Sequence, residues 1–149
     1  MSRDASSPTI VAEELKKYGA AYVANNRLGQ SGFRAAVTDA YHRRCAFTGE
    51  KTLPALQASH IKPYAESGPH QVNNGLLLRA DLHQLFDRGY ITLTSNYKVV
   101  VSDRIREEFN NGKEYLALSG SSLHSIPEQN INLPSEQFVQ FHNDHVYVE

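Results

Sequence analysis

Residues 58–93, ASHIKPYAESGPHQVNNGLLLRADLHQLFDRGYITL, place the tightest limit on what this chain can form. A short strand candidate over 56–61 is followed by a loop over 63–74 rich in Gly, Pro and Asn, and by an apolar strand over 75–78. Helical spacing then holds over 81–87, and Gly89 is placed to end that helix. This order predicts a compact strand–loop–strand–helix unit, written ββα.

The flanking segments predict an α+β fold around this unit. Apolar residues recur at helical intervals over 10–25 and over 33–42, and a turn-rich connector follows over 45–55. Residues 90–94 and 97–101 both show the alternating pattern of a strand and flank Ser95-Asn96, which predicts a hairpin. Residues 102–110 can form a helix capped by Ser102 or Asp103. From Gly112 the pattern is mixed. We expect an N-terminal helix with a flexible start over 1–26 and one domain over 27–149, with its motif core at 41–94.

Length and composition fit one globular domain in the cytoplasm. A chain of 149 residues can bury a real core, and 40% hydrophobic with 21% charged residues is ordinary for such a domain. No apolar run reaches the roughly 20 residues needed to cross a bilayer, and the N-terminus lacks a signal-peptide core. A single cysteine, Cys45, excludes an internal disulfide framework and is expected to be a packed thiol.

Four side chains in the ββα segment suit metal-assisted attack on a phosphodiester. His60, at the end of the first strand, is assigned as the general base. Asn74 opens the second strand, where its amide can pin the loop that holds the base or bind a metal. His83 and Asp87 are spaced i, i+4 on a helix, so they share a face and can hold one cation. Taken singly, each residue has a purely structural explanation; the combination favours function.

Other polar residues near this segment are weaker candidates. Lys62, Arg79 and Arg88 are reasonable DNA phosphate contacts, although the net charge of −1 requires any basic surface to be local. His42 and His70 flank the segment and are expected to be solvated. His142 and His145 are spaced three apart and are expected to form a surface pair.

The chain resembles the HNH endonuclease family, most closely the subgroup found in bacterial restriction endonucleases. The stretches that carry the resemblance are RLGQSGFRAAVTDAYHRRCAFTG, ASHIKPY and NGLLLRADLHQLFDRG. It implies a ββα-metal (HNH, His-Me finger) core, with His60 activating water, Asn74 orienting that histidine or its loop, and His83 binding metal. In some members, such as the colicin nucleases, the position of Asp87 supplies a second ligand.

Two positions depart from the family pattern. Many members carry Asp or His before the first motif histidine as a metal ligand, whereas this chain has Ser59, a poor ligand that we keep as a candidate beside Asp87. Many members also hold a structural zinc with two CxxC pairs. Here Thr48, Arg79 and Leu82 stand at three of those positions, so hydrophobic packing must replace the zinc. The candidates for this packing are Phe47, Leu53, Leu78, Leu82, Leu85 and Phe86.

The sequence therefore predicts a metal-dependent endonuclease acting on double-stranded DNA, as the nuclease part of a restriction or defence system. One divalent ion is expected, with Mg²⁺ first and Mn²⁺, Ni²⁺ or Zn²⁺ as alternatives. The resemblance implies 5′-phosphate and 3′-hydroxyl products, little base readout by the motif, and a separate DNA-recognition domain or subunit; a homodimer is open. Three alternatives remain: a DNA-binding module of the same fold with weak or no catalysis, a toxin-type nuclease, and a structural domain in which His83 and Asp87 only support packing.

Overall fold

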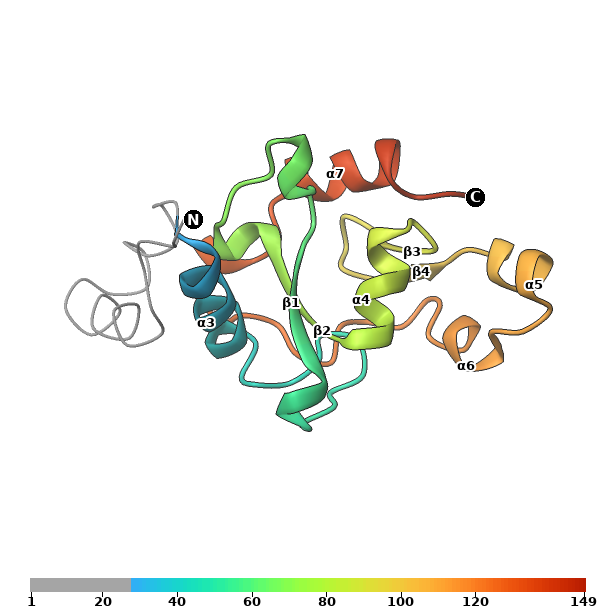
Figure 1. Ribbon diagram of the computed structural model, residues 1–149, viewed down its shortest axis with the longest axis horizontal. Helices are drawn as coiled ribbons and strands as arrows, with labels where there is room; N and C mark the ends of the chain where they lie inside the picture. The colour runs from blue at the N-terminus through green and yellow to red at the C-terminus, as the bar shows by residue number, and fades with distance from the viewer. Residues whose placement is uncertain (1–27) are drawn as a thin grey trace, which may run out of the picture.

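The computed structural model describes residues 28–149, and the predicted helix over 10–25 lies outside this range. Figure 1 shows the order of the elements. The described helices and strands are α3 (Gln30–Ala40), β1 (Leu56–His60), β2 (Gly75–Arg79), α4 (Ala80–Asp87), β3 (Ile91–Leu93), β4 (Val99–Val101), α5 (Arg104–Phe109), α6 (Lys113–Leu116) and α7 (Glu136–His145). These elements match the predicted α+β order, including the turn-rich connector before β1.

Strands β1 and β2 and helix α4 form the predicted ββα unit. The strands are antiparallel, with Leu56 opposite Arg79 and His60 opposite Gly75. Because α4 begins directly after Arg79, the helix returns along the strand pair and packs against both strands. Every residue of β2 except Arg79 is buried, which explains its continuous apolar run in place of alternation. The register sets His60 and the start of β2 at one end of the unit.

Helix α3 packs against this end of the strand pair, and Gly75 permits the close approach. A Cβ at Gly75 would lie 2.5 Å from Cγ2 of Val37 and 3.2 Å from the ring of Phe33. Both side chains project from α3 and are buried. Carbon atoms in contact are normally about 3.5–4.0 Å apart, so any larger residue would push α3 away from β2.

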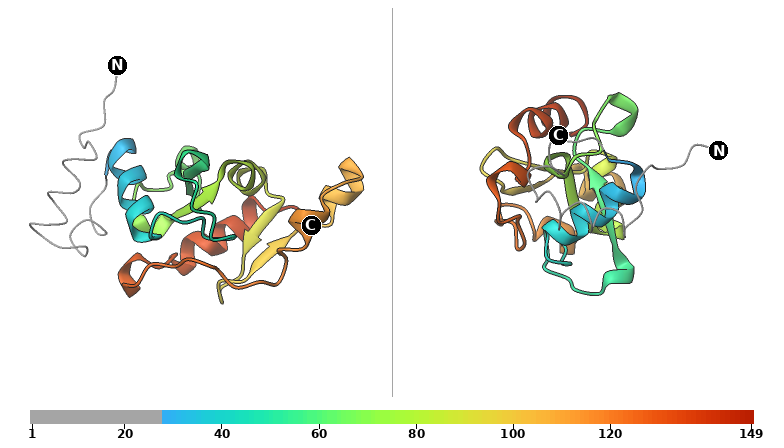
Figure 2. Two further views of the ribbon diagram at one scale, coloured as in Figure 1. Left: turned by 90° about the horizontal axis from the view of Figure 1, so that it is seen from below. Right: turned by 90° about the vertical axis from the view of Figure 1, so that its left-hand side faces the viewer.

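The second strand pair, β3 and β4, forms the predicted hairpin and packs against α7 (Figure 2). His142 of α7 is buried, so the prediction of a surface pair with His145 was wrong for this residue. Its Nε2–H donates to the carbonyl of Phe86 at 2.9 Å, and Thr92 donates its hydroxyl to Nδ1 at 2.7 Å. Burial lowers the pKa of His142 to about 4, although the hydrogen bond to Phe86 partly opposes this shift. The imidazole is therefore neutral at ordinary pH.

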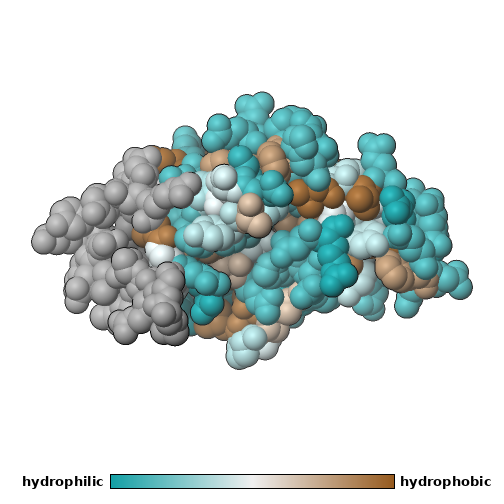
Figure 3. Space-filling model, turned by 45° about the horizontal axis from the view of Figure 1, so that its top comes forward, coloured by the Kyte–Doolittle hydropathy of each residue, from teal (hydrophilic) through white to brown (hydrophobic). Residues whose placement is uncertain are grey.

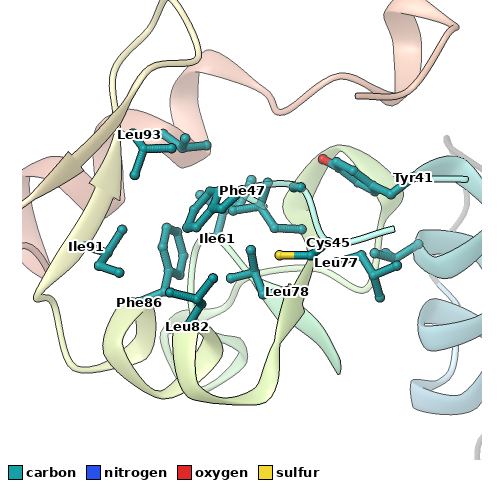
Figure 4. Packing of buried hydrophobic residues seen from close by; sticks show 14 of the residues in the cluster. Tyr41, Cys45, Phe47, Ile61, Leu77, Leu78, Leu82, Phe86, Ile91 and Leu93 are labelled. Carbon is teal, nitrogen blue, oxygen red and sulfur yellow. The ribbon is translucent and has the colours of Figure 1, made fainter. Parts of the chain in front are cut away.

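A hydrophobic core occupies the region where the family carries a zinc knuckle. Cys45 is a buried free thiol, as predicted, and Figure 4 shows it beside Leu77 and Leu78. Four of the six predicted packing residues are fully buried, namely Phe47, Leu78, Leu82 and Phe86. Leu85 is partly buried against the core, whereas Leu53 lies outside it. Side-chain packing therefore holds together the strands, α4 and the connector.

The surface is mixed in character. Figure 3 shows a face on which hydrophilic side chains predominate and hydrophobic patches are small. Within residues 28–149, no helix has both the length and the apolar character that crossing a bilayer would require.

Candidate active site

His60 lies at the end of β1 between aromatic rings from two other segments. Its imidazole stacks on Phe33 of α3, with ring centroids 4.2 Å apart and planes 10° apart. On another side its Nε2 is 2.8 Å from Nδ1 of His70, and the ring of His70 stacks on Tyr64 at 4.4 Å and 10°. The ring of His60 is thus fixed by contacts from α3 and from the loop between β1 and β2.

These surroundings change the acid–base behaviour that the sequence predicted for His60. The pKa of His60 is lowered to about 4, mainly by burial and in smaller part by positive charge on His70 and His83, while the carboxylate of Asp87 partly opposes the shift. Partial burial disfavours the charged imidazolium form of His60. At neutral pH the imidazole is therefore neutral and can accept a proton.

Asn74 is fully buried, and its amide holds the loop that follows His60. The Lys62 backbone N–H donates to Oδ1 at 2.8 Å, and Nδ2 donates to the carbonyls of Lys62 and Pro69 at 3.0 Å each. The Asn74 carbonyl also accepts a bond from the N–H of Ile61 at 2.9 Å. Of the two roles left open by the sequence, this geometry favours positioning of the loop, because both side-chain atoms are engaged with backbone.

His83 and Asp87 face each other on α4 as the i, i+4 spacing predicts. Nε2 of His83 lies 3.0 Å from Oδ2 of Asp87. Nδ1 of His83 lies 2.7 Å from Oε1 of Gln57, a residue of β1, so the Gln57 oxygen accepts the Nδ1–H. That bond leaves the Nε2 lone pair directed at a carboxylate oxygen. Two acceptors at this distance attract each other only when a proton or a metal ion lies between them.

The His83–Asp87 pair fits a divalent cation. Ligand atoms about 2.1 Å from one ion and at right angles to each other are separated by about 3.0 Å, close to the observed spacing. The side chains are 24% and 54% exposed, which leaves room for water and phosphate as further ligands. Gln57 plays the part of the outer partner that orients a metal-binding histidine. Within residues 28–149 no group of three or more His, Cys, Asp or Glu side chains converges to form a closed cage.

The structure places Ser59 and the three basic candidates in different surroundings. The Ser59 hydroxyl is buried and makes only long contacts of 3.5 Å, to the carbonyl of His60 and to Oδ1 of Asp87. Lys62 lies with Nζ 4.7 Å from the centre of the Phe141 ring. Arg88 is exposed at the end of α4.

Arg79 lies at the opposite end of the strand pair from His60. Its guanidinium makes two bonds to Asp81, at 2.8 and 3.0 Å, and Asp81 also accepts a bond from Tyr115. The Arg79 guanidinium holds the pKa of Asp81 at about 2, so this carboxylate is charged at all ordinary pH values. A phosphate would have to compete with this pair for Arg79.

A cleft of about 640 Å³ adjoins the His83–Asp87 pair. One wall comes from the loop after β1, which includes the 3-10 turn at Tyr64–Glu66, and the other from Phe141 and His145 of α7. Figure 1 shows this turn beside α7. Asp87 lines the cleft, so a ligand that binds at the His83–Asp87 pair could extend into the cleft.

Sequence reasoning missed two residues of this site. Gln57 gave no signal, because its partner His83 lies on a different element. His70 was expected to be solvated, but its ring is held between His60 and Tyr64. Its PHQ context next to a Gly-Pro turn shows no periodicity from which the direction of its side chain could be predicted.

Comparisons with known proteins agree with this geometry. A family model described as HNH endonuclease matches residues 45–94, which span β1, β2, α4 and β3. The match confirms the predicted resemblance of this segment to HNH endonucleases. No curated protein matches the chain.

A solved structure titled modification-dependent TagI restriction endonuclease is similar to the chain, with a TM-score of 0.54 and 19% sequence identity. The similarity covers 85% of this chain and 42% of that one, so this chain spans less than half the length of its structural neighbour. At this identity the likeness shows the fold, and it extends well beyond the segment that the family model matches. The predicted α+β fold with a ββα core is confirmed.

Proposed function

We propose that this protein is a metal-dependent endonuclease that hydrolyses phosphodiester bonds of double-stranded DNA. The observation that carries the proposal is that one ββα unit holds the ring-stacked His60 and, on α4, a His83–Asp87 pair whose facing atoms are 3.0 Å apart, a spacing that fits one divalent cation. Asp87 lies 3.5 Å from the hydroxyl of Ser59, the residue next to His60. The HNH endonuclease match over residues 45–94 supports this chemistry.

His60 is the proposed general base. A neutral imidazole takes a proton from water, so that an O–H bond breaks as an N–H bond forms, and the resulting hydroxide attacks phosphorus. The P–O3′ bond then breaks, which leaves a 5′-phosphate and a 3′-hydroxyl once the leaving oxygen gains a proton from solvent. Asn74 takes no part in the proton transfer; its amide holds the loop after His60 in place.

His83 and Asp87 are the proposed metal ligands, and Mg²⁺ is the proposed ion. When bound, the cation supplies charge stabilisation for the phosphate and the leaving oxygen. We leave Ser59 out of the ligand set because its hydroxyl is buried and its contact to Asp87 is long. Gln57 orients the ring of His83 through Nδ1.

Lys62 and Arg88 are the proposed phosphate contacts, since Lys62 lies two residues after His60 and Arg88 directly follows Asp87 at the end of α4. With a net charge of −1, the chain depends on such local positive groups for DNA binding. Contacts of this kind position the duplex and carry no sequence information, so target choice requires a separate recognition domain or subunit.

The proposed setting is a restriction or defence system in the cytoplasm. The structural neighbour is, by its title, a modification-dependent restriction endonuclease, and we extend the restriction role to this chain on the shared fold. Because one such site cuts one strand, a double-strand break requires either two chains, as in a homodimer on DNA, or two successive cuts by one chain.

Plasmid cleavage tests the proposal. The wild type is assayed with Mg²⁺, Mn²⁺, Ni²⁺, Zn²⁺ or EDTA beside His60→Ala and a control, His124→Ala, which removes an exposed histidine outside the site. We expect metal-dependent nicking that falls at least about 100-fold in His60→Ala and is unchanged in the control. If the folded wild type binds DNA but does not cleave it in the presence of any of these metals, catalysis is refuted and the DNA-binding alternative is supported.

A further inference from the structure

A second histidine is bonded to the proposed base. Nε2 of His60 and Nδ1 of His70 are 2.8 Å apart, a distance at which one nitrogen must donate and the other accept. The two rings are 4.9 Å apart and inclined at 50°. This arrangement brings together residues ten positions apart on opposite sides of a Gly-Pro turn.

Several contacts hold His70 in this place. The carbonyl of Pro69 accepts a bond from buried Asn74, and the carbonyl of His70 accepts one from the N–H of Leu28, both at 3.0 Å. Tyr64 stacks on the His70 ring on the side away from the core. Backbone and ring are therefore both fixed, as is expected of a residue that must present one nitrogen in a defined direction.

We propose that His70 is a positioning residue that selects the active tautomer of His60. By accepting the Nε2–H of His60, it places the lone pair on Nδ1, which becomes the atom that takes the proton from water. In the opposite arrangement His70 would donate, Nδ1 of His60 would carry the hydrogen, and His60 could not act as a base. This inference rests on the proposed function and adds a residue to its site.

The bond to His70 also supports the step itself. When Nδ1 of His60 takes the proton, the ring becomes an imidazolium with hydrogens on both nitrogens. The Nε2–H···Nδ1 bond then has a charged donor, and such bonds are about twice as strong as neutral ones. Because His70 accepts this bond as a neutral ring, the interaction is stronger after proton transfer than before it, which lowers the barrier to that transfer.

Replacement of His70 separates this role from simple packing. His70→Asn keeps an acceptor oxygen near the position of Nδ1, whereas His70→Leu has similar bulk and no acceptor. We expect kcat for plasmid nicking to fall about 10- to 100-fold in His70→Leu with KM nearly unchanged, and to stay within about 5-fold of wild type in His70→Asn. Thermal melting of each variant establishes that it is folded, and His70→Ala serves if the Leu variant is not.

Imidazole ¹⁵N NMR tests the pairing without using activity. We expect the Nε2–H tautomer of His60 in the metal-free wild type and in His70→Asn, and a mixture of tautomers in His70→Leu. His60→Gln identifies the resonances. Wild-type activity in His70→Leu, with the His60 tautomer unchanged, would overturn the inference while leaving the nuclease proposal intact. An inactive wild type would refute the nuclease proposal, and the NMR result would still decide whether His70 sets the tautomer.

Discussion

Replacement of Asn74 by Ala should destabilise the protein by about 3 kcal/mol. The change removes three hydrogen bonds between a fully buried amide and the loop after His60, at 2.8, 3.0 and 3.0 Å. Each bond contributes about 1 kcal/mol net, and the backbone groups of Lys62 and Pro69 lose their partners. For a chain of this size the loss corresponds to a fall in Tm of about 6–12 °C.

The neighbouring residue supplies a matched control. Oδ1 of Asn73 is buried without a hydrogen-bond partner, so Asn73→Ala removes an amide of the same size at a cost of less than about 1 kcal/mol. Urea unfolding followed by circular dichroism measures both variants, and calorimetric titration measures Mg²⁺ binding to each. Equal stability of the two variants, together with loss of metal binding only in Asn74→Ala, would refute loop positioning and make Asn74 a metal ligand.

Three further perturbations test other contacts. Gly75→Ala should destabilise the fold by about 1–3 kcal/mol, as denaturant unfolding can measure, because the added methyl would lie 2.5 Å from Val37. Gln57→Ala should weaken metal binding about 10- to 100-fold in calorimetric titration while leaving the fold intact, because His83 loses the oxygen that orients it; unchanged affinity would contradict that role. The folded-state pKa of His142, about 4, lies below its ordinary value of 6.5, so the unfolded state binds more protons between these values. The contribution of His142 to the free energy of unfolding should therefore fall by up to about 3 kcal/mol as pH drops from 6.5 to 4, and His60, whose pKa is also lowered, should add a further fall. His142→Gln should show a smaller total fall than the wild type, and an identical pH dependence would refute a neutral buried His142.

Patterns among residues close in the sequence correctly predicted the secondary-structure elements and contacts that such residues form. Helical spacing located α4, alternation located the β3–β4 hairpin, and the i, i+4 rule located the His83–Asp87 pair. The spacing of His142 from His145 led to the wrong prediction of a surface pair, whereas its spacing from Phe138 and Val139 marks the buried face of α7. That signal was present in the sequence.

Contacts between distant segments left no such signal. The stacking of Phe33 on His60 depends on how α3 crosses the strand pair, and the hydrogen bond between His60 and His70 depends on the path of a loop. The lowered pKa of His60 follows from these same contacts, so it was unpredictable for the same reason. The charge of Arg79 predicts a phosphate contact, whereas in the structure its guanidinium forms an ion pair with Asp81.

The packing of α3 and α7 has a practical consequence for how this domain can be moved between proteins. The segment that matches the family model ends at residue 94 and begins at 45, so it omits Phe33 beneath His60 and His142 against Phe86. A fusion built from residues 45–94 alone would carry the motif without the supports that fix its base. A transferable unit must therefore include α3 and α7 as well as the matched segment.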